Sequence, residues 1–340
     1  MQRYTVAVLG CGKRGRLHAE LFKQNERFEL VALCDIDEER LKTASELVGG
    51  VRTYTDAATM LGEQRPDVFC FCTLPALRMP LVRLGVENGV KLIAMEKPLA
   101  TSLAEAKAMV DLCQQAGVKM VVSHQQKYGQ HWRKAKEIID SGALGRVHTI
   151  YGTTTGWMLQ MATHITDYIL YFNDYAKAEW VLGQAHGREK LSDNHPSPDH
   201  LGGFIQFSNG VRGVLEAGSL APDVPEVEYF WHKARVSAYG TEGFAEAVIG
   251  LGWRACTRAS GGAISGPGGW SASDQVPYIQ DIAEWLDDPA KVHPCNGERA
   301  YQGLEIIMAM VRSAVEHRKV DLPLEPGEPE IEMLNRVLPG

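Results

Sequence analysis

Five short apolar segments, separated by helical patterns, dominate the first 124 residues. They are nearly continuous in hydrophobic residues and rich in Val, Ile, Leu and Phe, which is typical of parallel strands buried on both faces. They cover residues 5–10, 29–35, 67–74, 90–96 and 119–124. Helical patterns lie between them at about residues 14–24, 37–48, 77–89 and 102–116. This alternation of strand and helix predicts an α/β fold with a doubly wound parallel sheet.

The pattern changes after residue 124. Segments rich in β-forming residues follow one another, and FSNGV at residues 207–211 is typical of a hairpin turn. The expected strands lie within residues 146–156, 179–187, 202–210, 212–220, 227–240 and 243–250. Expected helices cover residues 131–142, 158–172, 275–287 and 297–317, and the Gly/Ser-rich residues 259–269 are expected to form a mobile surface loop. We therefore predict two domains, residues 1–124 and an α+β domain of residues 125–340 with a mainly antiparallel open sheet.

Three glycines mark the first strand-to-helix turn. Gly10, Gly12 and Gly15 form a GxGxxG pattern, and Asp35 lies 20 positions after Gly15 at the end of the next strand. Glycines allow a pyrophosphate to approach the backbone closely, and the N–H groups at the start of the helix can bind it. The context therefore predicts a dinucleotide site of the Rossmann type.

The acidic residue also predicts which dinucleotide binds. The Asp35 carboxylate can accept hydrogen bonds from the adenosine ribose and would repel a 2′-phosphate, and Asp37 adds a nearby negative charge. We therefore expect NAD rather than NADP. Lys13 and Arg14 lie in the same loop and are expected to face the pyrophosphate or solvent.

A second motif follows the strand within residues 90–96. Glu96 and Lys97 stand at the end of this strand, where ligands bind in open α/β sheets, and Pro98 restricts Lys97 to extended geometry. With this EKP motif the chain resembles the Gfo/Idh/MocA family, the relatives of glucose–fructose oxidoreductase and inositol dehydrogenase. The resemblance rests on GCGKRG (10–15), Asp35, EKP (96–98), residues 123–147 and residues 297–324.

The resemblance implies roles for these residues. It places Lys97 beside the nicotinamide and the substrate hydroxyl, and we expect Thr73 and Pro75 to contact the ribose or nicotinamide. The expected cofactor-binding residues are Gly10, Gly12, Lys13, Arg14, Gly15, Asp35, Thr73, Pro75, Glu96 and Lys97. The family often has His where this chain has Arg78.

A polar stripe follows the expected helix 158–172. Gln160, His164 and Asp167 share one face at helical spacing, although a single His on such a helix is more often a satisfied core residue. The family has Asp in place of Gln160, with that Asp and the His at the substrate. A carboxamide cannot act as a base, so we expect Gln160 to orient His164 or the substrate. His164 should then act as general base or acid, because an imidazole titrates near a pKa of about 6.5.

The remaining polar candidates lie near the expected substrate. Gln126 and Tyr128 are expected at the site entrance with Lys127, where the family often has Arg. The expected substrate-binding residues are Lys97, Gln126, Tyr128, Gln160 and His164. His195 and His200 stand five apart in a Pro-rich loop without convincing ligand spacing, so we predict no metal site.

Three functions fit these residues. The first is an NAD-dependent dehydrogenase that transfers a hydride between the carbinol of a sugar, polyol or sugar derivative and nicotinamide, with Lys97 polarising or deprotonating the hydroxyl. The second is a redox-neutral enzyme with tightly bound NAD that cleaves or epimerises a glycoside. The third is a non-catalytic dinucleotide-binding regulator, against which the intact Lys97 and His164 argue.

Composition limits the partners. The net charge of −7 without a basic cluster argues against nucleic acid, and no apolar run approaches the roughly 20 residues of a membrane span. Seven scattered cysteines suit a reducing compartment, and MQRYTVAVLG enters a strand without signal-peptide regions, so we expect a cytoplasmic protein. The resemblance implies a homodimer or homotetramer that pairs through the outer face of the C-terminal sheet.

Overall fold

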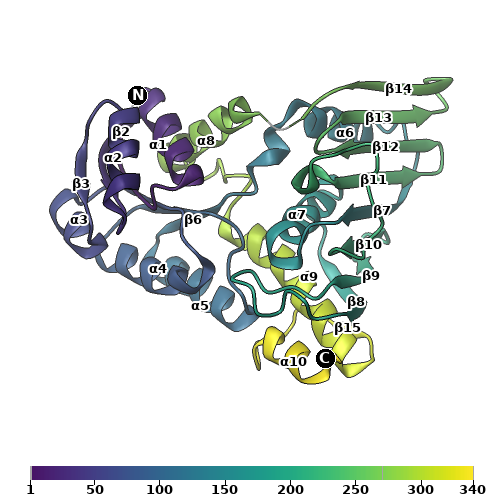
Figure 1. Cartoon of the computed structure of the whole chain (residues 1–340). Helices are drawn as coiled ribbons and strands as arrows, with labels where there is room; N and C mark the ends of the chain where they lie inside the picture. The colour runs from purple at the N-terminus through teal and green to yellow at the C-terminus, as the bar shows by residue number, and fades with distance from the viewer. Residues whose placement is uncertain (1, 270, 340) are drawn as a thin grey trace. The chain divides into compact units, whose positions relative to one another are not determined.

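The computed structural model describes residues 2–269 and 271–339 and contains two compact units (Figure 1). The first unit holds Met1–Ala100, Glu105–Gln125 and Ala272–Glu298. The second holds Thr101–Ala104, Gln126–Ser271 and Arg299–Gly340. Over the residues that the structure describes, no helix is both long enough and apolar enough to cross a membrane.

The first unit is built on a six-stranded parallel sheet with the strand order β3-β2-β1-β4-β5-β6, which confirms the predicted doubly wound parallel sheet. Its strands are β1 (Tyr4–Leu9), β2 (Phe28–Cys34), β3 (Arg52–Tyr54), β4 (Val68–Phe71), β5 (Leu92–Met95) and β6 (Lys119–Val122). Its helices are α1 (Lys13–Gln24), α2 (Glu38–Leu47), α3 (Ala57–Gln64), α4 (Arg78–Glu87), α5 (Leu103–Ala116) and α8 (Gln275–Asp287). The strand order reverses between β1 and β4, so their carboxyl ends form the crevice where open α/β sheets bind ligands.

Two elements of this unit were not predicted. The strand β3 has only three residues, none of them buried, and therefore lacks the apolar run that marks its neighbours; α3 follows it. The first unit also includes Ala272–Glu298, although the sequence predicted that this unit ends at residue 124. This segment belongs to the first unit because α8 packs on α1. Asn25 donates to Gln280 at 3.3 Å, and Arg27 Nη2 bonds both carboxylate oxygens of Asp287 at 2.9 and 2.7 Å.

The second unit contains a nine-stranded sheet in the order β14-β13-β12-β11-β7-β10-β9-β8-β15. Its strands are β7 (Val147–Thr154), β8 (Ala178–His186), β9 (His200–Phe207), β10 (Arg212–Ala217), β11 (Ala234–Gly240), β12 (Gly243–Val248), β13 (Gly252–Thr257), β14 (Gly262–Pro267) and β15 (Val320–Asp321). Only the β7–β10 pair is parallel among these described strands, which confirms the mainly antiparallel sheet. The predicted turn at FSNGV joins β9 to β10, with Gly210 at φ +82°.

Helices cover one face of this sheet (Figure 1). They are α6 (Gln130–Asp140), α7 (Thr163–Phe172) and α9 (Gly297–Glu316), and α10 (Glu330–Val337) follows near the C-terminus. The expected helix over residues 158–172 is present, but its first turn, η3 (Met158–Ala162), is a π turn. Single π turns inside helices are frequent at functional sites.

The prediction of a surface loop at residues 259–269 was wrong. Residues 262–267 form the edge strand β14, which pairs antiparallel with β13 and sets Ile264 opposite Ala255. Most of β14 is exposed, so it has no buried face and no alternation of apolar and polar residues. Backbone hydrogen bonds to β13 define this strand, and the Gly/Ser-rich sequence gave no side-chain signal for it.

Candidate active site

The glycine turn after β1 is shaped by close packing. Gly10 has φ +89°, and a Cβ there would press on the carbonyl of Cys72. A Cβ on Gly15 would collide with the carbonyl oxygen of Gly10. The fold itself therefore requires glycine at both positions, whatever binds to the turn.

Gly12 is different. Its φ of −68° suits any residue, and a Cβ there would meet no described atom within 4 Å. No side chain of the described residues caps the N-terminus of α1 at Gly12, so the first N–H groups of the helix remain available to an anion. Glycine at this position leaves open backbone beside an uncapped helix, which fits a pyrophosphate.

Asp35 stabilises the same turn. Its Oδ2 accepts the Cys11 N–H at 2.6 Å and its Oδ1 accepts the Asp37 N–H at 2.9 Å. A carboxylate offers about four lone-pair sites, so two remain for ribose hydroxyls. The sequence predicted only the ribose contact; the hydrogen bond to Cys11 adds a structural role.

Glu96 joins the glycine turn to the EKP motif. Its Oε1 accepts from Arg14 Nε at 3.0 Å and lies 3.2 Å from His18 Nε2, and both partners belong to α1. Burial raises the pKa of Glu96, but the Arg14 charge and the His18 hydrogen bond outweigh burial and hold this pKa well below its usual range. Arg14 therefore binds an ionised Glu96, whereas Lys13 is exposed.

The same cluster contains three potential metal ligands. Donor atoms of His18, Cys72 and Glu96 lie within 4.8 Å of one another. The Arg14 guanidinium already binds the Glu96 carboxylate. A hydrogen bond with Cys70 and burial raise the pKa of the Cys72 thiol, which keeps this thiol protonated. These groups fit a hydrogen-bonded cluster better than a metal site.

Lys97 follows β5 in a half-buried position, and its peptide bond to Pro98 is cis. Burial lowers the pKa of Lys97; Glu96 opposes this effect, whereas the charges of Arg14 and Arg78 add to it. Arg78 is 1% exposed, and its Nη2 donates to the Lys97 carbonyl at 2.8 Å. Arg78 therefore anchors the backbone of Lys97 and makes its ammonium group more acidic.

Thr73 and Pro75 lie on the loop after β4. The Thr73 hydroxyl oxygen is buried and has no hydrogen-bond partner among the described residues. Pro75 begins the short helix η1 (Pro75–Leu77). A buried hydroxyl in this position is a candidate for a cofactor contact, because buried polar groups normally have a partner.

His164 belongs to a hydrogen-bond chain in the second unit. It is 4% exposed on α7, and its Nδ1 lies 3.1 Å from the Tyr168 hydroxyl, which donates to Gln126 Oε1 at 3.2 Å. An amide oxygen only accepts, so the single hydroxyl proton of Tyr168 is directed to Gln126. His164 Nδ1 must therefore donate to Tyr168, which leaves Nε2 as the basic nitrogen of the neutral ring.

Asp167 has a different role from His164. Lys127 Nζ lies 2.6 Å from Asp167 Oδ2 and donates to the Tyr175 hydroxyl at 2.9 Å. Lys127 and Asp167 are 3% and 1% exposed, so they form a buried ion pair. Lys127 does not lie at a site entrance, as the sequence had suggested, because its ammonium is held in this pair.

The other expected substrate residues lie on neighbouring elements of the second unit. Gln160 is half-buried in the π turn η3, and Tyr128 is half-buried at the end of η2 (Gln125–Tyr128). Their contacts with a substrate stay a prediction. His200 begins β9 and pairs with Glu216 at 2.5 Å. Tyr168 was missed, although its spacing of four residues from His164 was a usable signal.

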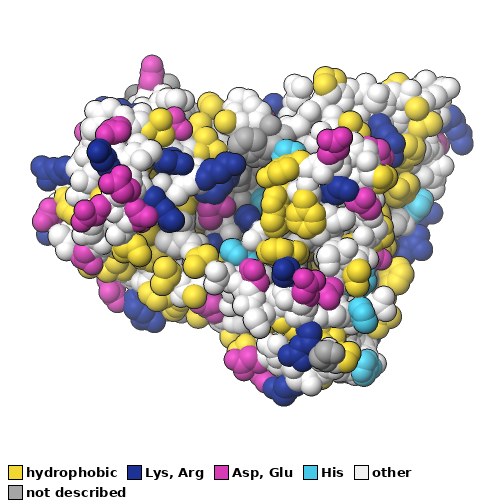
Figure 2. Space-filling model, in the orientation of Figure 1, with side chains coloured by type: hydrophobic (Ala, Val, Ile, Leu, Met, Phe, Trp, Pro, Cys, Tyr) yellow, Lys and Arg dark blue, Asp and Glu magenta, His cyan; other side chains and the backbone are white. Residues whose placement is uncertain are grey.

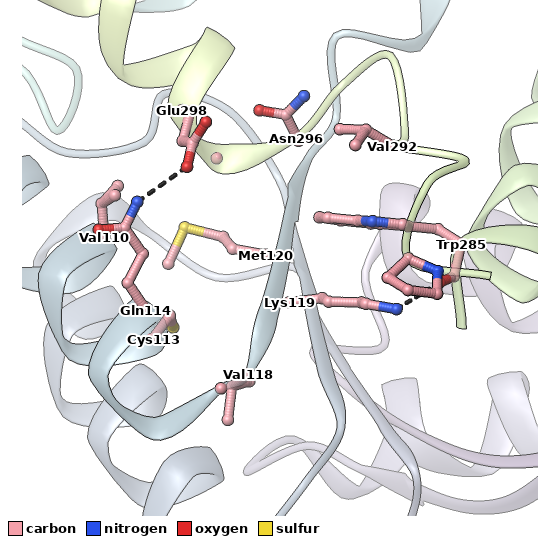
Figure 3. A pocket seen from close by; sticks show the side chains of 13 residues that line it. Val110, Cys113, Gln114, Val118, Lys119, Met120, Trp285, Val292, Asn296 and Glu298 are labelled. Atoms are coloured by element: carbon pink, nitrogen blue, oxygen red, sulfur yellow. Dashed lines mark hydrogen bonds between the residues drawn. The ribbon is translucent and has the colours of Figure 1, made fainter. Parts of the chain in front are cut away.

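A cavity of about 300 Å³ lies elsewhere in the first unit (Figure 3). Trp285 and Val292 face Met120 and the stem of Lys119 across it, and the Lys119 ammonium bonds the Trp285 carbonyl. Lys119 begins β6, so this cavity lies at the amino end of that strand. The dinucleotide crevice lies at the carboxyl ends of the strands, and the cavity is not part of it.

Comparison with known proteins finds a family match for the first unit. Residues 4–124 match the family model GFO_IDH_MocA, an oxidoreductase family with an NAD-binding Rossmann fold. D-apiose dehydrogenase of Paraburkholderia graminis is 35% identical over 145 residues, 43% of this chain and 38% of that relative. Myo-inositol 2-dehydrogenase of Thermotoga maritima is 23% identical over 264 residues, 72% of this chain and 75% of the relative.

Solved structures extend the similarity in fold to both units. A levoglucosan dehydrogenase in complex with NADH and L-sorbose has a TM-score of 0.81 at 20% identity, covering 96% of this chain and all of the other. An oxidoreductase from Agrobacterium radiobacter in complex with NAD+ and L-tartaric acid has a TM-score of 0.80 at 19% identity, covering 94% and 98%. Residues 4–124 therefore contain an NAD-binding Rossmann domain of the kind that this oxidoreductase family has.

We predict that Asp35→Asn weakens the preference for NAD. The variant keeps an oxygen for the Cys11 N–H but loses the charge that opposes a 2′-phosphate. The ratio of the dissociation constants for NADPH and NADH should fall about tenfold, equivalent to about 1.4 kcal/mol. Fluorescence titration measures both constants, and Asp37→Asn is the matched control with a smaller expected change. Equal affinity of the unmodified protein for both cofactors would contradict the ribose assignment.

Proposed function

We propose that the protein is an NAD-dependent dehydrogenase that transfers a hydride between a carbinol carbon of a sugar, polyol or sugar derivative and the nicotinamide ring. The observation that carries this proposal is the link through Glu96, which joins the open glycine turn to Lys97. The carbohydrate class is supported by relatives named as apiose, inositol and glucoside dehydrogenases. Because the first of them matches over only 38% of its length, the substrate is part of the proposal.

The first unit holds and orients the cofactor. The backbone at Gly12 and the uncapped start of α1 bind the pyrophosphate, and Asp35 accepts from the adenosine ribose. The Thr73 hydroxyl supplies a further polar contact. When bound, NAD accepts the hydride, which is the difficult step of the reaction.

Proton transfer is assigned to residues of the chain. Oxidation of a carbinol releases a hydride from carbon and a proton from oxygen. We assign acceptance of this proton to His164 Nε2, and stabilisation of the developing negative charge on oxygen to the Lys97 ammonium. A more acidic ammonium is a stronger hydrogen-bond donor, so the lowered pKa of Lys97 favours this role.

A redox-neutral reaction is the second candidate. It is favoured by Gln160, which places a carboxamide on the π turn η3 where the family has a carboxylate. In that case the hydride would return to the substrate after a bond is cleaved or a centre inverts. Turnover of a glycoside by purified protein without added NAD would distinguish this candidate from a dehydrogenase.

We also propose a cytoplasmic location. All seven cysteines are free thiols, which suits a reducing compartment. Recovery of the protein in the periplasmic or secreted fraction of its cells would contradict this location.

We predict that Lys97→Ala removes turnover and leaves NAD binding largely intact. A group that stabilises charge in the transition state affects kcat, and such groups typically contribute about 10²- to 10⁴-fold. Lys91→Ala is the matched control, because Lys91 is exposed and directly precedes β5, whereas Lys97 follows it. Near-normal turnover of Lys97→Ala at saturating substrate would show that another residue holds the reacting oxygen.

We predict that the pH dependence of kcat follows His164. Activity should fall as the pH drops through the titration of the imidazole, because a protonated base cannot accept the substrate proton. His164→Ala should abolish this limb and cost far more than Gln160→Ala. Tyr168→Phe removes the oxygen that accepts from His164 Nδ1–H. Because the His164 imidazolium then loses a hydrogen bond, the fall in kcat should shift to lower pH. If the fall in kcat near neutral pH survives in His164→Ala, another residue must act as the base. The next candidates are Tyr128 and the histidines within residues 192–200.

We further propose that two copies associate through the open face of the second sheet. Cross-strand neighbours Leu182, Phe204, Val214 and Tyr151 form an apolar row on that face, and Leu182 and Phe204 are 45% and 56% exposed. Exposed apolar rows of this kind mark self-complementary interfaces.

We predict that Phe204→Glu converts the oligomer to a monomer, because the row would have to bury a charge against its own copy. Light scattering after size-exclusion chromatography measures the mass. Leu47→Glu, at the end of α2 and 49% exposed, is the matched control. A monomeric unmodified protein would contradict the interface.

A further inference from the structure

The second unit carries a cluster of aromatic side chains beside the π turn η3. The aromatic cluster consists of Trp157, Tyr229, Phe230, Trp231 and His232. Tyr229 and Phe230 are 57% and 37% exposed, and both tryptophans are half-buried. Hydrophobic side chains gather over the part of this unit that contains α7 (Figure 2).

The rings of the cluster meet edge to face. Trp157 and Trp231 have centroids 5.4 Å apart at 79°, and Phe230 and Trp231 have centroids 4.9 Å apart at 80°. Ring planes at nearly right angles form a corner with two flat walls. A pyranose ring fits such walls, because one of its faces carries C–H groups and its hydroxyls point outward to the rim.

Polar groups border the aromatic corner. The Lys190 ammonium lies over one face of the Trp157 ring, 5.3 Å from its centre, and Lys233 pairs with Asp223 at 2.8 Å. The loop that carries Lys190 is anchored to the π turn, because the buried Ser197 hydroxyl accepts the Met158 N–H at 2.9 Å. Flat aromatic rings with charged groups beside them suit a hydroxylated ring better than an aliphatic chain.

The cluster is continuous with the residues assigned to proton transfer. The Trp157 carbonyl accepts the N–H groups of Gln160 at 3.1 Å and Met161 at 2.7 Å, and His164 follows on the same helical segment. A ligand bound beside Trp157 is therefore held next to the turn that carries Gln160 and leads into the helix of His164. The rings of the cluster are not among the residues assigned to the reacting carbinol, so the cluster is available to a second ring.

We propose that the aromatic cluster binds the second ring of a glycoside whose first ring is oxidised, so that the substrate class is a glycoside or small oligosaccharide. This inference rests on the proposed dehydrogenase function and names its substrate class. Stacking on Trp231 holds the non-reacting ring, and Lys190, which lies over Trp157, and the Lys233–Asp223 pair bind its hydroxyls.

The test compares one-ring and two-ring sugars on the NAD-loaded protein. Saturation-transfer NMR measures binding of D-glucose, D-xylose, cellobiose and maltose directly, and reduction of NAD is followed in parallel. We expect at least one disaccharide to bind the unmodified protein more tightly than either monosaccharide. Trp231→Ala should weaken that disaccharide about tenfold, within the range of an aromatic stacking contact, and change D-glucose less than twofold. Trp231→Phe keeps a flat ring and should retain most of the affinity.

Trp253→Ala is the matched control, because Trp253 is a half-buried tryptophan of β13 outside the cluster. Equal effects of Trp231→Ala on one-ring and two-ring sugars, or no preference of the unmodified protein for any disaccharide, would overturn the proposal. If disaccharides bind through Trp231 but no sugar reduces NAD, the dehydrogenase function fails and the subsite stands. If monosaccharides reduce NAD and Trp231→Ala changes nothing, only the subsite fails.

Discussion

The contact of Glu96 with Arg14 and His18 is the interaction on which the first unit depends. One buried carboxylate oxygen binds two side chains of α1, while its own backbone leads directly into Lys97. The helix that presents its uncapped N–H groups beside Gly12 is thereby held against the loop that carries the lysine. Arg78 supports the same loop through the Lys97 carbonyl. The glycine turn and Lys97 are therefore joined by one charged cluster, in which Arg14 and Arg78 lower the pKa of Lys97.

The helix α7 of the second unit carries two buried polar side chains that have different kinds of partner. Asp167 is neutralised by Lys127 in a buried ion pair, and removing one partner of such a pair typically costs about 3–5 kcal/mol. One turn earlier, His164 Nδ1 lies 3.1 Å from the Tyr168 hydroxyl. Gln126 continues the chain by accepting the Tyr168 hydroxyl proton, and this orientation leaves Nε2 as the unprotonated nitrogen of the neutral His164 ring.

Local motifs explain which parts could be predicted from the sequence. The glycine turn, Asp35 and Lys97 lie at strand ends, and short patterns identify such positions, so the doubly wound sheet and its crevice could be predicted. The contacts of Glu96 with α1 join residues about 80 positions apart, and the contact of α8 with the end of α1 joins residues 255 positions apart. Neither leaves a local signal. The edge strand β14 was missed because it buries almost nothing, and the Tyr168 contact requires knowing where each proton points.

Hydride transfer itself is the most direct test. The NAD-loaded protein is mixed with sugars and glycosides that carry deuterium at their carbinol carbons, and the cofactor is analysed by NMR and mass spectrometry. Deuterium at C4 of the reduced nicotinamide, in amounts equal to the oxidised sugar, is the predicted result. Tight NAD binding without transfer from any compound of the panel would contradict a dehydrogenase.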